Sequence, residues 1–267
     1  MAAIVKLGGS LAAAGTLPTW LDVILTQGGG RAVIVPGGGE FADGVRAAQK
    51  RLRFSDRTAH RMALLAMQQY GLLLQELAPA LRPCADAAQI AAALAAGGTA
   101  LWLPSAMVEA DATISESWDV TSDSLAAWLA RRLGATRLVL VKSAPAPDAP
   151  PSLERLAALG LVDAAFPTYA AKAGIPVVYC GPSDTARLAD FLSLNRHAPR
   201  SDKMHRHSRE SGNPAGGPGS PLARRAVRGI ETGDSKDSAF GSCVPQTARS
   251  QRLAMGQKPL ARLDKLS

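Results

Sequence analysis

The chain has 267 residues, of which 47% are hydrophobic and 4% aromatic, and its formal net charge is +8. No apolar run approaches the roughly 20 residues that a membrane-spanning helix needs, and the first nine residues do not resemble a secretory signal. Three widely separated cysteines give neither a disulfide framework nor a metal-ligand spacing, so we expect a reducing, cytoplasmic location.

In chain order, the first part of the chain is predicted to form a strand at Ala3–Leu7, a helix at Leu17–Thr26, a strand at Ala32–Val35, and helices at Phe41–Lys50, Ser55–Leu81 and Gln89–Ala96. The next part is predicted to form a strand at Thr99–Leu103, a helix at Ser124–Leu133 and a strand at Arg137–Val141. A helix at Leu153–Leu159, a strand at Pro176–Tyr179 and a helix at Asp184–Leu192 are predicted to follow. Strands that alternate with helices indicate an α/β fold. We expect a three-layer sandwich with a mostly parallel central sheet between helices, and a ligand beyond the carboxyl ends of the strands.

The basic charge is concentrated at the end of the chain. Residues 198–267 carry 13 Lys and Arg against 6 Asp and Glu, whereas residues 1–197 carry 17 against 16. The nearly neutral part, residues 1–196, is predicted to be one catalytic domain that takes a small-molecule substrate, with no nucleic acid or membrane as a partner. Residues 197–267 have little apolar periodicity and are predicted to be a disordered basic tail.

Part of this tail, His205–Pro214, resembles the translation of a bacterial intergenic repeat. That resemblance suggests a frameshift or a read-through product. A genuine basic tail that binds nucleic acid is the alternative.

Two glycine-rich segments follow buried strands. The first reads Lys-Leu-Gly-Gly-Ser at Lys6–Ser10, and the second reads Pro-Gly-Gly-Gly at Pro36–Gly39. Glycines let backbone N–H groups approach an anion closely, and a lysine adds a charge. A tight turn and a flexible loop are the respective alternatives. If both segments bind ligands, they lie side by side at one edge of the sheet.

A third segment, Trp118–Ala127, places Thr-Ser-Asp before a helix. Ser122 or Asp123 could cap that helix. Capping does not require Trp118 or Asp119, so we predict that these two residues contact the substrate.

The three segments in this order resemble the amino acid kinase family over residues 3–192. Further segments, Ala59–Gly71, Glu116–Asp123 and Gly160–Pro167, resemble the branch that phosphorylates an aminomethyl-furan methyl phosphate during methanofuran biosynthesis. The resemblance implies an ATP-dependent kinase, with ATP and Mg²⁺ as cofactors and a homo-oligomer as its assembly. His60, within the first of these segments, is either a surface residue or an acceptor contact.

The resemblance also implies roles for single residues. Lys6 pairs with the transferring phosphoryl group, which the backbone of Gly8, Gly9 and Ser10 cradles. By the same resemblance, Asp123 organises the catalytic lysine and Mg²⁺, and no residue is predicted as a metal ligand.

The remaining implied roles concern the two substrates. Gly37, Gly38 and Gly39 hold the acceptor, and Lys142 lies at the ATP phosphates. For a phosphate acceptor, Arg46, Arg53, Arg57 and Arg61 are candidate partners. A carboxylate acceptor such as an amino acid, or a decayed protein that only binds nucleotide, remains an alternative.

The sequence departs from the family pattern twice. Ala144–Pro150 replaces an acidic-glycine-valine turn, with Asp148 as a possible acidic substitute. No final strand with a Gly-Thr follows Leu192, which predicts an uncovered sheet edge.

Overall fold

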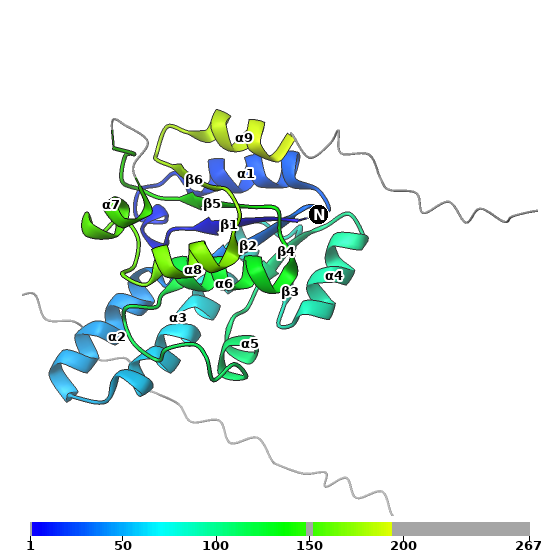
Figure 1. Ribbon diagram of the computed structural model, residues 1–267. Helices are drawn as coiled ribbons and strands as arrows, with labels where there is room; N and C mark the ends of the chain where they lie inside the picture. The colour runs from blue at the N-terminus through cyan, green and yellow to red at the C-terminus, as the bar shows by residue number, and fades with distance from the viewer. Residues whose placement is uncertain (1, 148–151, 194–267) are drawn as a thin grey trace, which may run out of the picture. The chain divides into compact units, whose positions relative to one another are not determined.

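The computed structural model describes residues 2–147 and 152–193 (Figure 1). The predicted tail at residues 197–267 and Asp148 lie outside these residues. The described part forms an α/β sandwich, as predicted (Figure 1).

The centre of the fold is a six-stranded sheet in which every pair of neighbouring strands is parallel. Its strands are β1 (Ala3–Leu7), β2 (Ala32–Pro36), β3 (Leu81–Cys84), β4 (Thr99–Trp102), β5 (Arg137–Val141) and β6 (Val177–Cys180). Their order across the sheet is β3-β4-β2-β1-β5-β6. The central strands β1 and β2 are buried along their whole length, as expected for a parallel sheet covered on both faces.

Helices cover both faces of this sheet. They are α1 (Leu17–Gly28), α2 (Gly39–Leu52), α3 (Asp56–Leu77), α4 (Ala87–Ala95), α5 (Ser105–Glu109), α6 (Ser122–Leu133), α7 (Leu153–Ala158), α8 (Phe166–Ala173) and α9 (Thr185–Ser193), with a short 3-10 helix at Gly9–Leu11. In Figure 1, α1 and α9 lie on one face and α6 and α8 on the other. Within residues 2–147 and 152–193, no helix is both long and apolar enough to cross a membrane.

The two-residue period of a strand determines which side chains face α6. Along β1, Ile4 packs in the core beneath α6 and α8, whereas Val5 packs in the core beneath α1 and α9. Along β5, Leu138 and Leu140 share the α6 face with Ile4. Lys6 and Lys142 continue this alternation beyond Ile4 and Leu140, so both lysines reach the α6 side of neighbouring strands.

One predicted helix end was wrong, and three elements were not predicted. The helix predicted to run to Leu81 ends at Leu77, and Leu81–Cys84 is instead the edge strand β3. The edge position tolerates Pro83, which cannot donate to a neighbouring strand. Helices α5 and α8 were not predicted, because each is short, with five and eight residues.

Candidate active site

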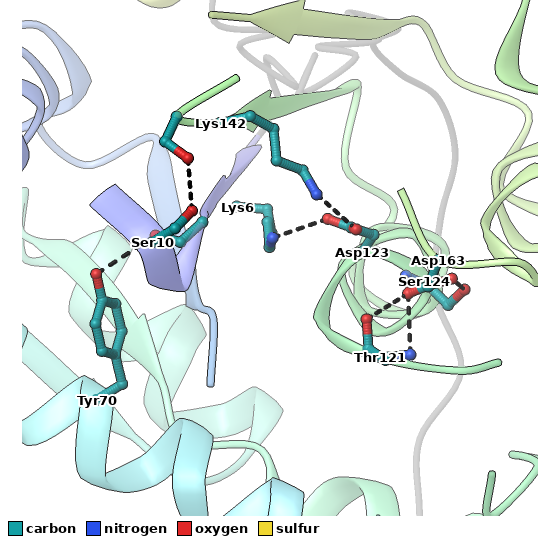
Figure 2. Close-up of polar contacts among 10 residues, drawn as sticks. Lys6, Ser10, Tyr70, Thr121, Asp123, Ser124, Lys142 and Asp163 are labelled. Atoms are coloured by element: carbon teal, nitrogen blue, oxygen red, sulfur yellow. Dashed lines mark hydrogen bonds and ion pairs between the residues drawn. The ribbon is translucent and has the colours of Figure 1, made fainter. Parts of the chain in front are cut away.

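Lys6, Asp123 and Lys142 meet at the carboxyl ends of β1 and β5. Lys6 Nζ lies 2.9 Å from Asp123 Oδ1, and Lys142 Nζ lies 2.7 Å from Asp123 Oδ2 (Figure 2). The side chains of Lys6 and Asp123 are each 5% exposed. The three groups sum to one positive charge that solvent barely screens, so the cluster suits an anion such as a phosphate group.

This pairing changes the pKa of both Asp123 and Lys142. Burial alone would raise the pKa of Asp123, but the two ammonium groups outweigh it and hold that pKa at about 2. Burial, helped by the charge of Lys6, lowers the pKa of Lys142 to about 8, although Asp123 opposes the change. Asp123 is therefore an anion at neutral pH and cannot act as a general base there.

The pKa of Lys142 predicts a loss of anion binding in alkaline solution. The ammonium form, which attracts phosphate, prevails only below about pH 8. We expect the affinity of the site for a phosphate group to fall as the pH rises through about 8, because the neutral amine of Lys142 no longer attracts the anion. The matched variant Lys142→Arg stays charged, so its profile should lack this decline. An unchanged decline in Lys142→Arg would assign the titration to another group.

The same lysine has a predictable effect on folding. Its pKa in the folded chain is below the ordinary value of 10.5, so the folded state binds fewer protons than the unfolded state between about pH 8 and 10.5. Its contribution to the free energy of unfolding therefore rises with pH across that window.

The two glycine-rich segments pack against each other. A Cβ atom on Gly9 would lie 2.1 Å from the backbone nitrogen of Gly39, and one on Gly37 would lie 2.4 Å from that of Gly9. Gly39 also has a φ of +54°, in the left-handed region that favours glycine. Close approach of the two loops to each other therefore accounts for these glycines before any ligand is considered.

Two of the predicted amide donors are already engaged. The N–H of Gly8 donates to the carbonyl of Val141 at 2.9 Å, and the N–H of Gly37 donates to that of Leu7 at 2.8 Å. Both bonds extend the sheet into the loops, so these two N–H groups are not available to a ligand. The segments still contribute Gly9, Ser10, Gly38 and Gly39 to the site; these line the pocket described next.

A pocket of about 260 Å³ opens beside the lysine cluster. Its lining includes Lys6, Asp123 and Lys142 together with residues of α2, α3 and the loop before α6. Gly39 begins α2, a helix of 14 residues, and a helix N-terminus favours a negative group. Of the predicted arginines, only Arg46 lines this pocket among the described residues.

Of the other residues predicted to contact the substrate, some line this pocket and some do not. Trp118 lines the pocket, with the Arg46 guanidinium 4.3 Å from the centre of its ring. Asp119 is exposed and does not line this pocket. The substrate contact predicted for Asp119 therefore stays a prediction. Arg57 and Arg61 form ion pairs with Glu116 instead.

Asp163 holds the start of α6 in place, and sequence reasoning assigned it no role. Its Oδ2 accepts from the N–H of Thr121 at 2.9 Å, from the Thr121 hydroxyl at 2.8 Å and from the N–H of Ser124 at 3.0 Å; the Ser124 hydroxyl donates to Oδ1 (Figure 2). The predicted capping of α6 by Ser122 or Asp123 was wrong, because Asp163 supplies the cap from about 40 residues away along the chain.

Removing the Asp163 carboxylate should loosen the loop that carries Asp123. We expect Asp163→Ala to lower the free energy of unfolding by about 3 kcal/mol or more, since bonds to a charged acceptor contribute about 1.5–3 kcal/mol each. Asp163→Asn keeps one acceptor oxygen and should lose less. Denaturant unfolding of both variants measures this. Equal stability of Asp163→Ala and the wild type would contradict the capping role.

The altered loop after β5 packs on the start of the segment that follows β6. Tyr179 donates its hydroxyl to the carbonyl of Ala144 at 3.0 Å, and a Cβ atom on Gly181 would lie 3.0 Å from the nitrogen of Ala146. Ser143 at its start forms a 2.7 Å hydrogen bond with Ser10. The loop thus contacts the glycine-rich segment of β1.

A metal held by the protein does not fit these residues. The described residues contain no group of three or more His, Cys, Asp or Glu side chains that could hold a metal ion. The pocket carboxylate nearest the lysines, Asp123, already pairs with two ammonium groups.

Comparison with known proteins identifies the family. The model of the amino acid kinase family matches residues 1–146. The chain belongs to the amino acid kinase family. This confirms the resemblance that the glycine-rich segments and the Thr-Ser-Asp segment predicted.

Individual members of the amino acid kinase family are also similar to the chain. It is 30% identical over 138 residues to the [5-(aminomethyl)furan-3-yl]methyl phosphate kinase of Methanocaldococcus jannaschii, a match that covers 51% of this chain and 63% of that protein. Among solved structures, uridylate kinase from Archaeoglobus fulgidus has a TM-score of 0.52 at 16% identity, covering 71% of this chain and 96% of that one. The UMP kinase from Ureaplasma parvum has a TM-score of 0.51 at 16% identity, covering 68% and 89%. These structures show the shared fold.

Proposed function

We propose that this chain is an ATP-dependent kinase that transfers the γ-phosphoryl group to the phosphate of an aminomethyl-furan methyl phosphate, forming a diphosphate. The observation that carries the proposal is the buried cluster in which Asp123 binds Lys6 and Lys142 at one end of a 260 Å³ pocket. The kinase from Methanocaldococcus jannaschii supports this choice of acceptor.

The chemistry fits what the cluster offers. An oxygen of the acceptor phosphate attacks the γ-phosphorus, the bond from that phosphorus to the β–γ bridging oxygen breaks, and ADP leaves with the electron pair. A phosphate monoester is largely dianionic at neutral pH, so the attack needs no general base. Lys6 stabilises the moving phosphoryl group, Lys142 the ATP phosphates, and Asp123 orients both lysines.

A panel of acceptors tests the proposal. With full-length chain and MgATP, we expect ADP release with the aminomethyl-furan phosphate and almost none with glutamate, aspartate or no acceptor. Release with an amino acid would support a carboxylate acceptor instead. Nucleotide binding in a titration without turnover of any acceptor would support a decayed, non-catalytic protein.

We further propose that residues 1–196 are the catalytic domain, because both hydrophobic cores and the pocket lie within the described residues. A homo-oligomer also remains a proposal. It is supported by large apolar side chains exposed on α2 and α3, namely Leu52, Met62, Leu65, Leu72 and Leu77. The cytoplasmic location stays a prediction.

A further inference from the structure

Helices α2 and α3 form two walls of the pocket. α2 contributes Gly39, Ala42, Asp43 and Arg46, and α3 contributes His60, Ala63, Leu64 and Met67. In each helix these residues recur at intervals of three or four, so they lie along one face. The pocket therefore extends along both helices.

Its inner end lies at the glycines. Gly39 starts α2, and a Cβ atom there would lie 3.1 Å from the ring of Tyr70 on α3. At 1.5 Å per residue, Arg46 lies about 10 Å from Gly39 along α2, and His60 lies about 15 Å from Tyr70 along α3. Arg46 and His60 therefore belong to the outer end, opposite the lysine cluster.

Between the two ends, the walls are apolar. Ala63, Leu64 and Met67 of α3 face Val120 and Leu125 around the cavity. At the outer end, Trp118 donates its indole N–H to Gln49 at 2.6 Å and supports the Arg46 guanidinium. Such a site fits an apolar body with an anionic group at its inner end.

His60 is the unusual group at the outer end. It is 5% exposed, and its Nε2 has no hydrogen-bond partner among the described residues. A backbone hydrogen bond at Ser117 engages the ring, so it is Nδ1 that makes this bond. If Nδ1 carries the proton, Nε2 of the neutral ring is left as an acceptor.

The charge state of His60 agrees with this assignment. Burial lowers the pKa of His60 by more than the backbone at Ser117 and the carboxylates of Glu116 and Glu109 raise it. The ring is therefore mainly neutral at pH 7. A buried nitrogen without a donor costs free energy, which a ligand that supplies a donor would recover.

We propose that His60 determines acceptor specificity: its Nε2 accepts a hydrogen bond from an ammonium group that the acceptor carries at the end opposite its phosphate. This inference rests on the proposed function, because the proposed reaction places the acceptor phosphate beside Lys6. At the same end, the Arg46 cation is paired with Asp43 at 3.0 Å, and the carboxylates of Glu116 and Glu109 act on the His60 ring, so the surroundings of His60 favour a cation. His60 also lines a second cavity of about 190 Å³. A preference between acceptors that depends on His60 would assign its Nε2 contact to the first pocket.

The test compares two acceptors that differ only at the outer end: the aminomethyl-furan phosphate and its analogue with a methyl group in place of the aminomethyl group. For the wild type, we expect kcat/KM to favour the amine at least tenfold. His60→Asn keeps a donor where Nδ1 lies but removes the group at Nε2, and should reduce this preference to within threefold through a higher KM for the amine. KM for ATP should not change.

The matched variant His60→Gln places an amide oxygen near the position of Nε2 and should keep more of the preference than His60→Asn. Asp43→Asn, which alters the exposed rim, should keep most of it. The inference is overturned if the wild type shows no preference, if His60→Asn affects both acceptors equally, or if Asp43→Asn alone removes the preference. If the wild type phosphorylates neither furan, the proposed function fails as well, which distinguishes the two failures.

Discussion

Replacing Lys6 with alanine is expected to lower kcat for phosphoryl transfer by at least about a hundredfold while the chain stays folded. Stabilisation of developing charge by one donor contributes about 3 kcal/mol to the barrier, which corresponds to slightly more than two factors of ten. The Lys6 ammonium is buried and lines the pocket. The fold should persist because Asp123 keeps its bond to Lys142.

Two further variants make this result specific. Lys6→Met keeps most of the side-chain volume, so a similar loss of kcat would be due to the charge rather than to a cavity. Lys50→Ala removes an exposed lysine from α2 and should leave kcat within about twofold. Thermal melts of all three variants accompany the kinetics. If Lys6→Ala turned over within threefold of the wild type, Lys6 would not be catalytic.

The second large effect is expected for Asp123→Asn. The neutral amide cannot form an ion pair with either ammonium group, so the charges of Lys6 and Lys142 would repel each other in a buried site. Breaking a buried ion pair typically costs about 3–5 kcal/mol of stability. We expect a loss of kcat of at least a hundredfold together with a lower melting temperature, whereas the exposed control Asp22→Asn should change neither.

A pH profile separates this role of Asp123 from a purely structural one. Asp123 raises the pKa of Lys142 against the effects of burial and of Lys6. Without that carboxylate, the residual activity of Asp123→Asn should decline at a lower pH than that of the wild type. An unshifted profile with wild-type kcat would remove Asp123 from the active site.

Local patterns predicted much of the sheet and its catalytic ends. Buried runs such as Ala3–Leu7 and Arg137–Val141 form β1 and β5 with the predicted bounds. These strands are central and consist of apolar residues except for Lys6 and Arg137, so their signal does not depend on neighbours. β3 was missed because it has only four residues, includes Pro83 and lies at an edge.

The candidate site was harder to predict where it depends on distant parts of the chain. Motifs pointed to Lys6, Asp123 and Lys142 separately, but only the register of β1 and β5 brings both lysines to one carboxylate. Asp163 acts on backbone amides, which leave no trace in composition. The glycine-rich segments indicated that something approaches their backbone closely. Much of that approach is between the two loops themselves.

Phosphorus NMR of a single reaction mixture tests the central claim most directly. Full-length chain, MgATP and the aminomethyl-furan phosphate are incubated together and compared with the same mixture containing Lys6→Met. The account predicts that the acceptor monoester signal is replaced by a diphosphate pair while ADP forms in equal amount, and that the variant leaves the spectrum almost unchanged. Folded wild-type chain that binds ATP yet produces no diphosphate, or Lys6→Met that produces it at the wild-type rate, would contradict it.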